Sequence, residues 1–463
     1  MANKDKSIFA LSTPWGISGI SVIRVSGKGC RNLVKTMCSI KSPKPRYIYN
    51  CNLKDKQRNI IDNIMVVYFN SPKSFTGEDM LELYTHGSIA VIKRVLSELS
   101  YLPNLEPAQP GEFLKRAYFN NKISLIQAEG INHLIKSETE KQRIVSSNMS
   151  FNGTTSLCEK IKEDITYIGA LVDATIEFSE EDESTQKSNI EKLIYKIIKE
   201  LESQLKGIET TRKIFNGLNI IVFGPPNVGK SSLFNLITNS DNSIVTSKAG
   251  TTRDLIQVAL DVEGYKVNFT DTAGLRHTKD DIELIGIKRT TKKIESEDKL
   301  MLVLSPDSYN KKNVKSLKDL FNKITKKEII IIFNKEDLLN FKMSQKKWFD
   351  ALPFLKKTRF ITTNCVDKKT KHKMLRKISK FVKNEFIEKE KANDNNLFFT
   401  EYRHEAHLKK CLKFLKSSYN LLEKVELCSE ELRLALKEIE SIEGNVDSEI
   451  KLDIIFNKFC IGK

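Results

Sequence analysis

The sequence predicts a protein of several domains, with α/β structure at its N-terminus and again in its middle, and all-α structure around the middle part. Strand-like runs alternate with turns over residues 1–120. Apolar residues recur at three- and four-residue spacing over 121–216 and again from about residue 397, while strand and helix patterns alternate between them. At 463 residues the chain has room for about three domains.

The first 120 residues are expected to form a small α/β domain with a helix at 88–100. The strand-like runs are IFALSTP, GISVIRVSG, NIMVVYF and LELYTHG. The segment 74–87, SFTGEDMLELYTHG, is expected to bring four polar side chains near one turn: Glu78, Asp79, Glu82 and His86. They are either ligands or hydrogen-bonding groups for a small molecule, or parts of a solvated loop.

Helical periodicity predicts a second domain made of two halves, 121–216 and 386–463. The first half contains an acidic run at 179–184, expected to be an exposed loop, followed by a charged helix over 190–212. The simplest topology inserts the α/β region 217–385 between these halves, which then come together in space.

The stretch GPPNVGKSS at 224–232 matches the P-loop pattern G-x-x-x-x-G-K-[ST]. An apolar run precedes it as a strand would, and a helical pattern follows it. A strand, loop and helix in this order direct backbone N–H groups and a positive helix end towards a phosphate chain. Lys230 is then expected to pair with the terminal phosphates and Ser231 to ligate magnesium. The alternative is a glycine-rich turn that binds nothing.

Three further motifs follow the P-loop. KAGTTRD at 248–254 offers a threonine hydroxyl that can complete a magnesium shell when a γ-phosphate is present. In DTAG at 271–274, Asp271 is expected to hold magnesium through water and the Gly274 amide to sense the γ-phosphate. In NKED at 334–337, Asp337 can accept hydrogen bonds from the guanine ring N–H and exocyclic amine, which adenine cannot offer.

The four motifs in this order predict a GTP site. The residues expected to form it are Asn227, Val228, Gly229, Lys230, Ser231, Ser232, Thr246, Ser247, Lys248, Ala249, Gly250, Thr251, Thr252, Asp271, Thr272, Ala273, Gly274, Asn334, Lys335 and Asp337.

The residue after DTAG changes the expected mechanism of hydrolysis. Ras-like GTPases carry a glutamine there that orients the attacking water, whereas this chain has Leu275. Hydrolysis must therefore recruit another polar residue or be very slow. Candidates on the following segment are Arg276, Asp280, Asp281 and Glu283, and each carboxylate could equally be a helix-start residue favoured by the dipole. The side-chain oxygen of Asn227 could hold a monovalent cation beside the phosphates, which would supply the charge of an arginine finger.

The overall composition adds weaker information. A net charge of +17 favours an anionic partner such as RNA, although a general bias towards lysine explains it equally well. The eight cysteines form no CxxC pair, so we expect reduced thiols and no zinc site. Neither a signal-peptide pattern nor an apolar run of about 18 residues occurs, and we expect a soluble, cytoplasmic protein that does not insert into a membrane.

Taken together, GPPNVGKSSLFN, AGTTRD, DTAGLR, NKED and the terminal CIGK at 460–463 resemble the MnmE (TrmE) family of tRNA-modification GTPases. The resemblance extends to STPWGISGISVIRVSG, SFTGEDMLELYTHGS, PGEFLKRAYFNNKISLIQAEGI and EELRLALKEIESIEG, and so covers essentially the whole chain. CIGK is the most discriminating piece, because other P-loop GTPases do not end in this way.

The resemblance implies an N-terminal folate-binding domain over 1–120 that dimerises, and a helical domain that holds a Ras-like G domain over 217–385. It implies a homodimer whose G domains meet when potassium and GTP are bound. It also implies joint action with the flavoprotein MnmG, in a heterotetramer or larger complex, on the five position of the wobble uridine of certain tRNAs. The group added is aminomethyl or carboxymethylaminomethyl. Its one-carbon unit comes from 5-formyl- or methylene-tetrahydrofolate, with glycine or ammonium as nitrogen source.

The resemblance also assigns roles residue by residue. Glu283 matches the family's catalytic glutamate, which positions the attacking water through a bridging water. Ser231 and Thr252 match the magnesium ligands. The potassium ligands are matched by Asn227, Thr246, Lys248 (through its backbone) and Thr251, and the folate contacts by Arg24, Glu82, Lys122 and Lys463. Cys460 is either a nucleophile for covalent chemistry or a packed, inert thiol.

Three positions depart from the family pattern: the segment 14–17, Lys248, and Thr362–Asn364, which replaces the Ser-Ala stretch that backs the guanine.

Two other functions are compatible with the G-domain motifs. One is a ribosome-assembly GTPase, although no KH-type GXXG loop or RNA-recognition signature occurs outside 217–385. The other is a GTPase that has kept its switch but lost folate chemistry.

Overall fold

The computed structural model describes residues 6–151, 153–177, 183–240, 243–244, 257–271, 299–322, 327–365, 371–387, 398–444 and 449–462. The chain divides into two compact units. The first contains residues 1–136, 146–201 and 402–463, and the second contains 137–145 and 202–401. Within the described ranges, no helix is both long and apolar enough to span a bilayer.

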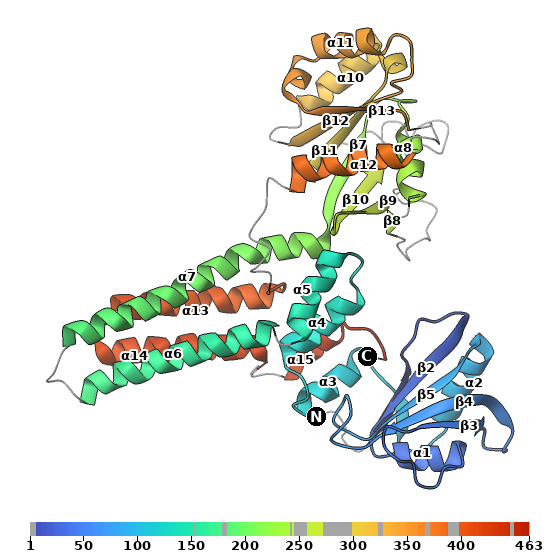
Figure 1. The fold of residues 1–463 in the computed structure, drawn as a ribbon, viewed down its shortest axis with the longest axis vertical. Coiled ribbons are helices and arrows are strands. Elements are labelled where there is room, and N and C mark those ends of the chain that lie inside the picture. The colour runs from blue at the N-terminus through green and yellow to red at the C-terminus, as the bar shows by residue number, and fades with distance from the viewer. Residues whose placement is uncertain are drawn as a thin grey trace. The chain divides into compact units, whose positions relative to one another are not determined.

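The N-terminal part of the first unit is a six-stranded sheet with the order β3-β4-β5-β2-β1-β6 (Figure 1). β6 runs parallel to β1, and the other neighbours are antiparallel. The strands are β1 (Ser7–Leu11), β2 (Ser18–Ser26), β3 (Ile48–Lys54), β4 (Ile60–Phe69), β5 (Met80–Gly87) and β6 (Leu105–Pro107). The predicted strands are confirmed as β1, β2, β4 and β5. β3 and β6 were not predicted, because polar residues interrupt the short apolar pattern of β3 and β6 has only three residues.

Helices α1 (Cys30–Met37) and α2 (Ile89–Ser100) cover one face of this sheet, and α2 confirms the helix predicted at 88–100. Leu33 and Val95 from these helices share a core with inward strand residues such as Ile23, Val25 and Leu83. Successive strand residues point to opposite faces. Arg24 and Glu82 therefore lie on the other face, where they are direct cross-strand neighbours.

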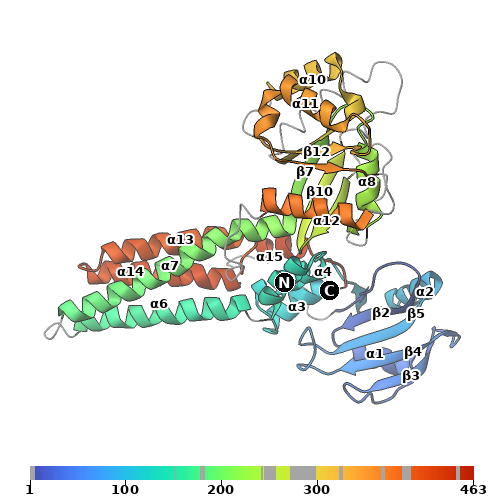
Figure 2. The ribbon, with the colours of Figure 1, turned by 45° about the horizontal axis from the view of Figure 1, so that its top comes forward.

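The rest of the first unit is helical, as predicted. Helices α6, α13, α14 and the first part of α7 lie side by side in both views (Figures 1 and 2). The helices are α3 (Glu112–Phe119), α4 (Leu125–Ile135), α5 (Glu140–Ser150), α6 (Gly153–Glu177), α7 (Glu183–Asn216), α13 (Tyr402–Asn420), α14 (Val425–Glu443) and α15 (Glu449–Phe456). The first part of α5 and the last part of α7 belong to the second unit. The predicted loop at 179–184 is wrong at its end, since α7 already begins at Glu183. Acidic residues are common in a first helical turn.

A buried charge cluster ties α4 to α13 and α14. The Glu129 carboxylate accepts a hydrogen bond from Arg403 Nη2 and lies 2.9 Å from each of Arg403 Nη2 and His404 Nε2. Arg403 Nη1 also donates to the carbonyls of Ser441 and Ile442, at 3.0 and 2.8 Å. Burial on its own raises the pKa of Glu129, but His404 and Arg403 outweigh it and lower the pKa to about 2.

The second unit contains a seven-stranded sheet with the order β13-β12-β11-β7-β10-β9-β8. The strands from β13 to β10 are parallel to their neighbours, and β9 and β8 continue the sheet antiparallel. The strands are β7 (Leu218–Phe223), β8 (Ser243–Ile244), β9 (Gln257–Val262), β10 (Tyr265–Asp271), β11 (Lys299–Leu304), β12 (Glu328–Asn334) and β13 (Phe360–Thr363).

Helices cover both faces of this sheet. α8 and α12 share a core with one face, and α10 and α11 share a core with the other. The helical elements are α8 (Lys230–Thr238), η2 (Pro306–Ser308), α10 (Lys311–Phe321), α11 (Phe341–Ala351), η3 (Pro353–Lys357), α12 (Lys371–Val382) and η4 (Lys383–Ile387). The predicted fold class, α/β parts combined with a helical part, is confirmed. The residue limits given to the four domain segments stay predictions.

We expect Glu129→Ala to lower the free energy of unfolding by roughly 3–5 kcal/mol, because it removes the carboxylate that faces the partly buried guanidinium of Arg403 and the buried ring of His404. The folded pKa of Glu129 lies below its ordinary value of 4.5. The stabilisation is therefore complete above about pH 4.5 and is lost as the pH falls towards about 2. Urea denaturation between pH 7 and pH 3 measures both effects.

The control is Glu430→Ala, which removes an exposed carboxylate paired with Arg433 on α14. This variant should unfold like the unaltered chain. Equal stability of the two variants would contradict a stabilising role for the cluster.

Candidate functional site

The P-loop lies at the carboxyl edge of the second unit's sheet, between β7 and α8. The carboxyl ends of the parallel strands meet at this edge, where α/β folds bind ligands. Two glycines are required by the close packing. At Gly224 (φ +152°) an added Cβ would lie 2.1 Å from the Val303 carbonyl oxygen, and at Gly229 (φ +94°) it would lie 2.1 Å from Asn334 Nδ2.

Lys230 is buried at the start of α8, with its ammonium held by the loop. Its Nζ donates to the carbonyl oxygens of Gly224 and Pro225, at 3.0 and 2.7 Å. Ser231 follows in the first helical turn and is exposed, so its hydroxyl is accessible. Asn227 is exposed in the left-handed region at φ +60°. The phosphate, magnesium and cation roles of these three residues stay predictions.

Asn334 links three loops through one side-chain amide. Its Nδ2 donates to the Val228 carbonyl in the P-loop at 3.0 Å. Its Oδ1 accepts from Thr363 Oγ1 at 3.1 Å and from the Cys365 amide at 3.2 Å. The segment Thr362–Asn364, which departs from the family pattern, is thereby joined to the NKED motif and the P-loop.

Lys335 is fixed by a partner that the sequence analysis did not identify. Lys335 Nζ lies 2.6 Å from Asp307 Oδ2, and Ser305 Oγ donates to Asp307 Oδ1 at 2.6 Å. Burial acts to raise the pKa of Asp307, but the hydrogen bonds from Lys335 and Ser305 outweigh it and lower the pKa. The sequence did hold a signal for Asp307, namely its position: it comes shortly after β11, as the NKED motif comes at the end of the neighbouring strand β12. Asp337 lies exposed on the same loop as Lys335.

The remaining predicted GTP and metal residues are described only in part. Asp271 ends β10, is buried, and lies opposite Val222 of β7. With Ser231 it offers oxygen atoms of the kind that magnesium prefers. The described residues contain no group of three His, Cys, Asp or Glu side chains that could hold a metal ion. Outside the described residues lie Thr246, Ser247, Lys248, Ala249, Gly250, Thr251, Thr252, Thr272, Ala273, Gly274, Leu275, Arg276, Asp280, Asp281 and Glu283.

In the first unit, Arg24 and Glu82 form the centre of a second candidate site. Arg24 Nε lies 2.8 Å from Glu82 Oε1, with exposed side-chain fractions of 28% and 13%. Tyr84 donates to Glu82 Oε2 at 2.5 Å. Burial, and to a smaller extent this hydrogen bond, raises the pKa of Tyr84 to about 12. The Arg24 guanidinium also lies 5.9 Å from the centre of the Phe75 ring. Tyr84 was missed, although strand alternation puts it on the face of Glu82.

Of the other predicted folate residues, Lys122 lies near the same sheet. The Lys122 side chain packs against Gly77, where an added Cβ would lie 3.1 Å from Lys122 Cγ. The C-terminal segment lies beside β1, since Ser12 Oγ donates to the Gly462 carbonyl at 2.9 Å and the Gly111 amide donates to the Cys460 carbonyl at 3.2 Å. Cys460 is half-buried, and Lys463 lies outside the described residues.

The prediction that Glu78, Asp79, Glu82 and His86 lie near one turn is wrong. Glu82 and His86 belong to the extended strand β5, and four strand residues span about 13 Å. The four side chains also have different partners. They contact, in order, Ser26 and Arg116, the Ser71 amide, Arg24, and Asp62. The turn itself is tied down by these contacts, so it is not a solvated loop either.

Comparison with known proteins bears on both sites. The family model "GTP-binding protein TrmE N-terminus" matches residues 7–122, and the model "MnmE helical domain" matches residues 125–460. The proteins named "tRNA modification GTPase MnmE" from Ehrlichia ruminantium (strain Welgevonden) and from Pelagibacter ubique (strain HTCC1062) are each 36% identical to this chain. Each alignment covers 99% of this chain and 100% of the relative. The protein of the same name from Wolbachia sp. subsp. Drosophila simulans (strain wRi) is 35% identical over the full length of both chains.

We expect Gly229→Ala to weaken binding of a fluorescent GDP analogue by at least about tenfold. The new methyl group would meet Asn334 Nδ2, and φ +94° strains any residue other than glycine. The control is Gly169→Ala on α6, where no atom lies within 4 Å of the added Cβ. Fluorescence titration gives the dissociation constants, and an unchanged value for Gly229→Ala would contradict the P-loop geometry described above.

Proposed function

The chain belongs to the MnmE family of tRNA-modification GTPases, and we propose that it uses GTP hydrolysis to drive modification of tRNA. The family predicted from the sequence is thereby confirmed, and the chain is a GTP hydrolase. The product we propose is an aminomethyl or carboxymethylaminomethyl group on the five position of the wobble uridine of certain tRNAs. The observation that carries this proposal is the match to the family over the full length of the chain. A ribosome-assembly GTPase is not favoured, because the match includes the regions outside 217–385.

We propose that the P-loop edge of the second unit binds GTP with magnesium. The buried ammonium of Lys230 would meet the terminal phosphates, and Asp337 would accept the two guanine donors. Ser231 and Thr252 would ligate magnesium. Potassium would be held by Asn227, Thr246, Lys248 and Thr251, and would supply positive charge as the γ-phosphate leaves. Glu283 would position the attacking water, because Leu275 cannot.

The proposed second ligand is 5-formyl- or methylene-tetrahydrofolate, bound near Arg24 and Glu82. The carboxylate of Glu82 is only 13% exposed and can accept N–H donors of a pterin ring. Arg24, Lys122 and Lys463 offer positive charge to the carboxylates of the folate's glutamate. Cys460 is half-buried and close to this sheet, which is compatible with a catalytic thiol and with a packed one.

We further propose a cytoplasmic homodimer, joined through residues 1–120, that works with the flavoprotein MnmG in a heterotetramer or larger complex. The family's action on tRNA supports this assembly. The net charge of +17 is compatible with an RNA substrate.

Nucleoside analysis of tRNA from cells that lack this protein tests the proposed function. We expect the aminomethyl-type groups on wobble uridines to be lost, because the proposed function makes this GTPase necessary for their addition. Expression of the unaltered chain should restore them. Normal wobble uridines in the deleted cells would rule out the proposed function.

We expect Glu283→Ala to leave GTP affinity nearly unchanged while removing most turnover, because water positioning acts on hydrolysis and not on binding. Turnover in KCl and affinity for a non-hydrolysable GTP analogue separate the two effects. Asp319→Ala on α10, which removes an exposed carboxylate, serves as the control. Unchanged turnover in Glu283→Ala would refute the role given to this residue.

A further inference from the structure

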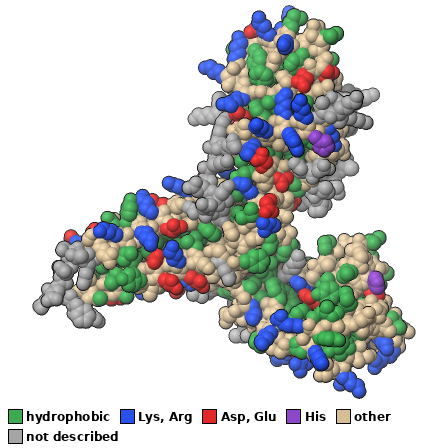
Figure 3. Space-filling view, in the orientation of Figure 1, with side chains coloured by type: hydrophobic (Ala, Val, Ile, Leu, Met, Phe, Trp, Pro, Cys, Tyr) green, Lys and Arg blue, Asp and Glu red, His purple; other side chains and the backbone are tan. Residues whose placement is uncertain are grey.

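Helix α12 presents a basic surface that the proposed function does not use. Its sequence, KHKMLRKISKFV, contains no acidic residue. Met374, Leu375, Ile378 and Val382 are buried against the sheet, whereas Lys373, Arg376 and Lys380 are exposed. The spacing of three and four residues places these three side chains along one side of the helix. We call Lys373, Arg376 and Lys380 the basic stripe. Figure 3 shows Lys and Arg side chains gathered where α12 lies in Figure 1.

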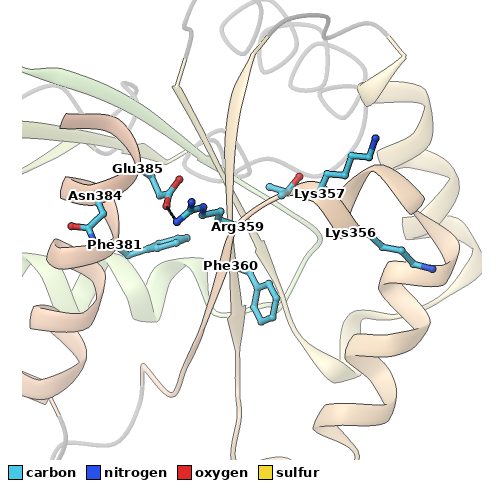
Figure 4. Close-up of a pocket in the computed structure, with 8 residues that line it drawn as sticks. Lys356, Lys357, Arg359, Phe360, Phe381, Asn384 and Glu385 are labelled. Atoms are coloured by element: carbon cyan, nitrogen blue, oxygen red, sulfur yellow. Dashed lines mark ion pairs between the residues drawn. The ribbon is translucent and has the colours of Figure 1, made fainter. Parts of the chain in front are cut away.

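The stripe leads to a hollow of about 430 Å³, which is in the size range of small-ligand sites. Phe381 and Asn384 line it from the helical side, and Lys357 lines it from η3 (Figure 4). Asn384 lies in the π-helical segment η4, which follows α12 directly. Arg359 and Phe360 contribute the third wall from the start of β13.

The hollow combines accessible cations with aromatic rings. Arg359 pairs with Glu385 at 3.1 Å, and the side chain of Arg359 is 73% exposed while that of Glu385 is 6% exposed. The buried carboxylate thus orients a guanidinium whose other donors face solvent. Phe360 is 43% exposed; its ring points away from Arg359 (Figure 4) and contacts the rings of Phe333 and Phe349 along part of its surface. Proteins bind unstacked RNA bases on aromatic and guanidinium planes of this kind.

This surface is separate from the GTP site. Phe360 begins β13, whereas Thr363 ends it and contacts Asn334 of the NKED motif. Since β13 is parallel to β12, the hollow lies at the amino end of the strands and the GTP site at the carboxyl end. A nucleotide in the P-loop would therefore leave the hollow open.

We propose that the basic stripe and the hollow bind the tRNA, with phosphates along α12 and one unstacked base in the hollow. This inference rests on the proposed function for the identity of the RNA. The charge of the stripe suits a phosphate backbone, and the rings and Asn384 suit a base. Asp319 lies among the exposed lysines of α10, whereas α12 carries no acidic residue, so the two lysine-rich helices differ in charge pattern.

The test compares two variants of the full-length protein that lose the same charge. The stripe variant is Lys373→Gln, Arg376→Gln and Lys380→Gln, and the control is Lys311→Gln, Lys312→Gln and Lys315→Gln on α10. Fluorescence anisotropy with a labelled tRNA transcript measures affinity from 50 to 200 mM KCl. We expect the stripe variant to bind at least about tenfold more weakly at 100 mM KCl. Its slope of log affinity against log salt should fall by roughly two to three, since each phosphate contact contributes about 0.7–0.9. The control should change by less than about threefold.

A second variant tests the hollow. Phe360→Leu keeps an apolar side chain against the core but removes the aromatic plane. We expect about fivefold weaker tRNA binding with an unchanged salt slope, because stacking is not an ionic contact. Affinity for a blunt RNA duplex should not change.

The inference would be overturned if the stripe and control variants lost tRNA affinity equally, or if the stripe variant kept its full tRNA affinity. Either result would leave the proposed function intact. Failure of the unaltered chain to bind tRNA would count against both. Normal GTP turnover in the stripe variant verifies that its fold is preserved.

Discussion

The edge of the sheet at which GTP is proposed to bind depends on the side-chain amide of Asn334. This amide is 1% exposed, and both of its polar atoms have partners on other loops. Aspartate could not donate to the Val228 carbonyl, and leucine would leave that carbonyl and the Cys365 amide without a partner. Unpaired buried groups of this kind cost about 1–3 kcal/mol each. The requirement for glycine at position 229 follows from the same contact, since the amide occupies the space of a side chain there.

The first unit uses a comparable arrangement to fix its C-terminus. Gly462 has φ +84°, and an added Cβ would lie 2.3 Å from the Leu11 carbonyl oxygen. Gly111 has φ +67°, and its Cβ would lie 2.4 Å from the Phe456 carbonyl oxygen. Only glycine permits these approaches, so the glycine of CIGK has a packing role beside β1. Two residues earlier, the Cys460 carbonyl accepts a hydrogen bond from the Gly111 amide at the start of α3, and this contact does not involve its thiol.

Local patterns in the sequence were sufficient for the main elements of both units. The P-loop, its strand and its helix are contiguous, and strands such as β2 and β5 show alternation with a clear apolar face. Contacts between distant segments could not be predicted in this way. Glu129 and Arg403 are 274 residues apart, and no local pattern pairs them. Asp307 and Tyr84 gave positional signals, and Tyr84 shares a strand with its partner Glu82. The partner of Asp307 became clear only from strand order, because Lys335 follows the neighbouring strand β12. The Arg359–Glu385 pair and its hollow depend on α12 returning to the edge strand, which no local pattern specifies.

β13 connects the two edges of the sheet at which ligands are proposed to bind. Phe360 and Thr363 are three residues apart, about 10 Å along a strand. Thr363 is bonded to Asn334, and Lys377 of α12 donates to the Thr362 carbonyl at 2.6 Å. A shift of β13 that accompanied a change of nucleotide would therefore move both α12 and the wall of the hollow. Coupling of binding sites is reciprocal, so RNA that favoured one position of β13 would change GTP affinity by the same factor. The short edge strand thus gives the two sites a physical connection that requires no contact between their ligands.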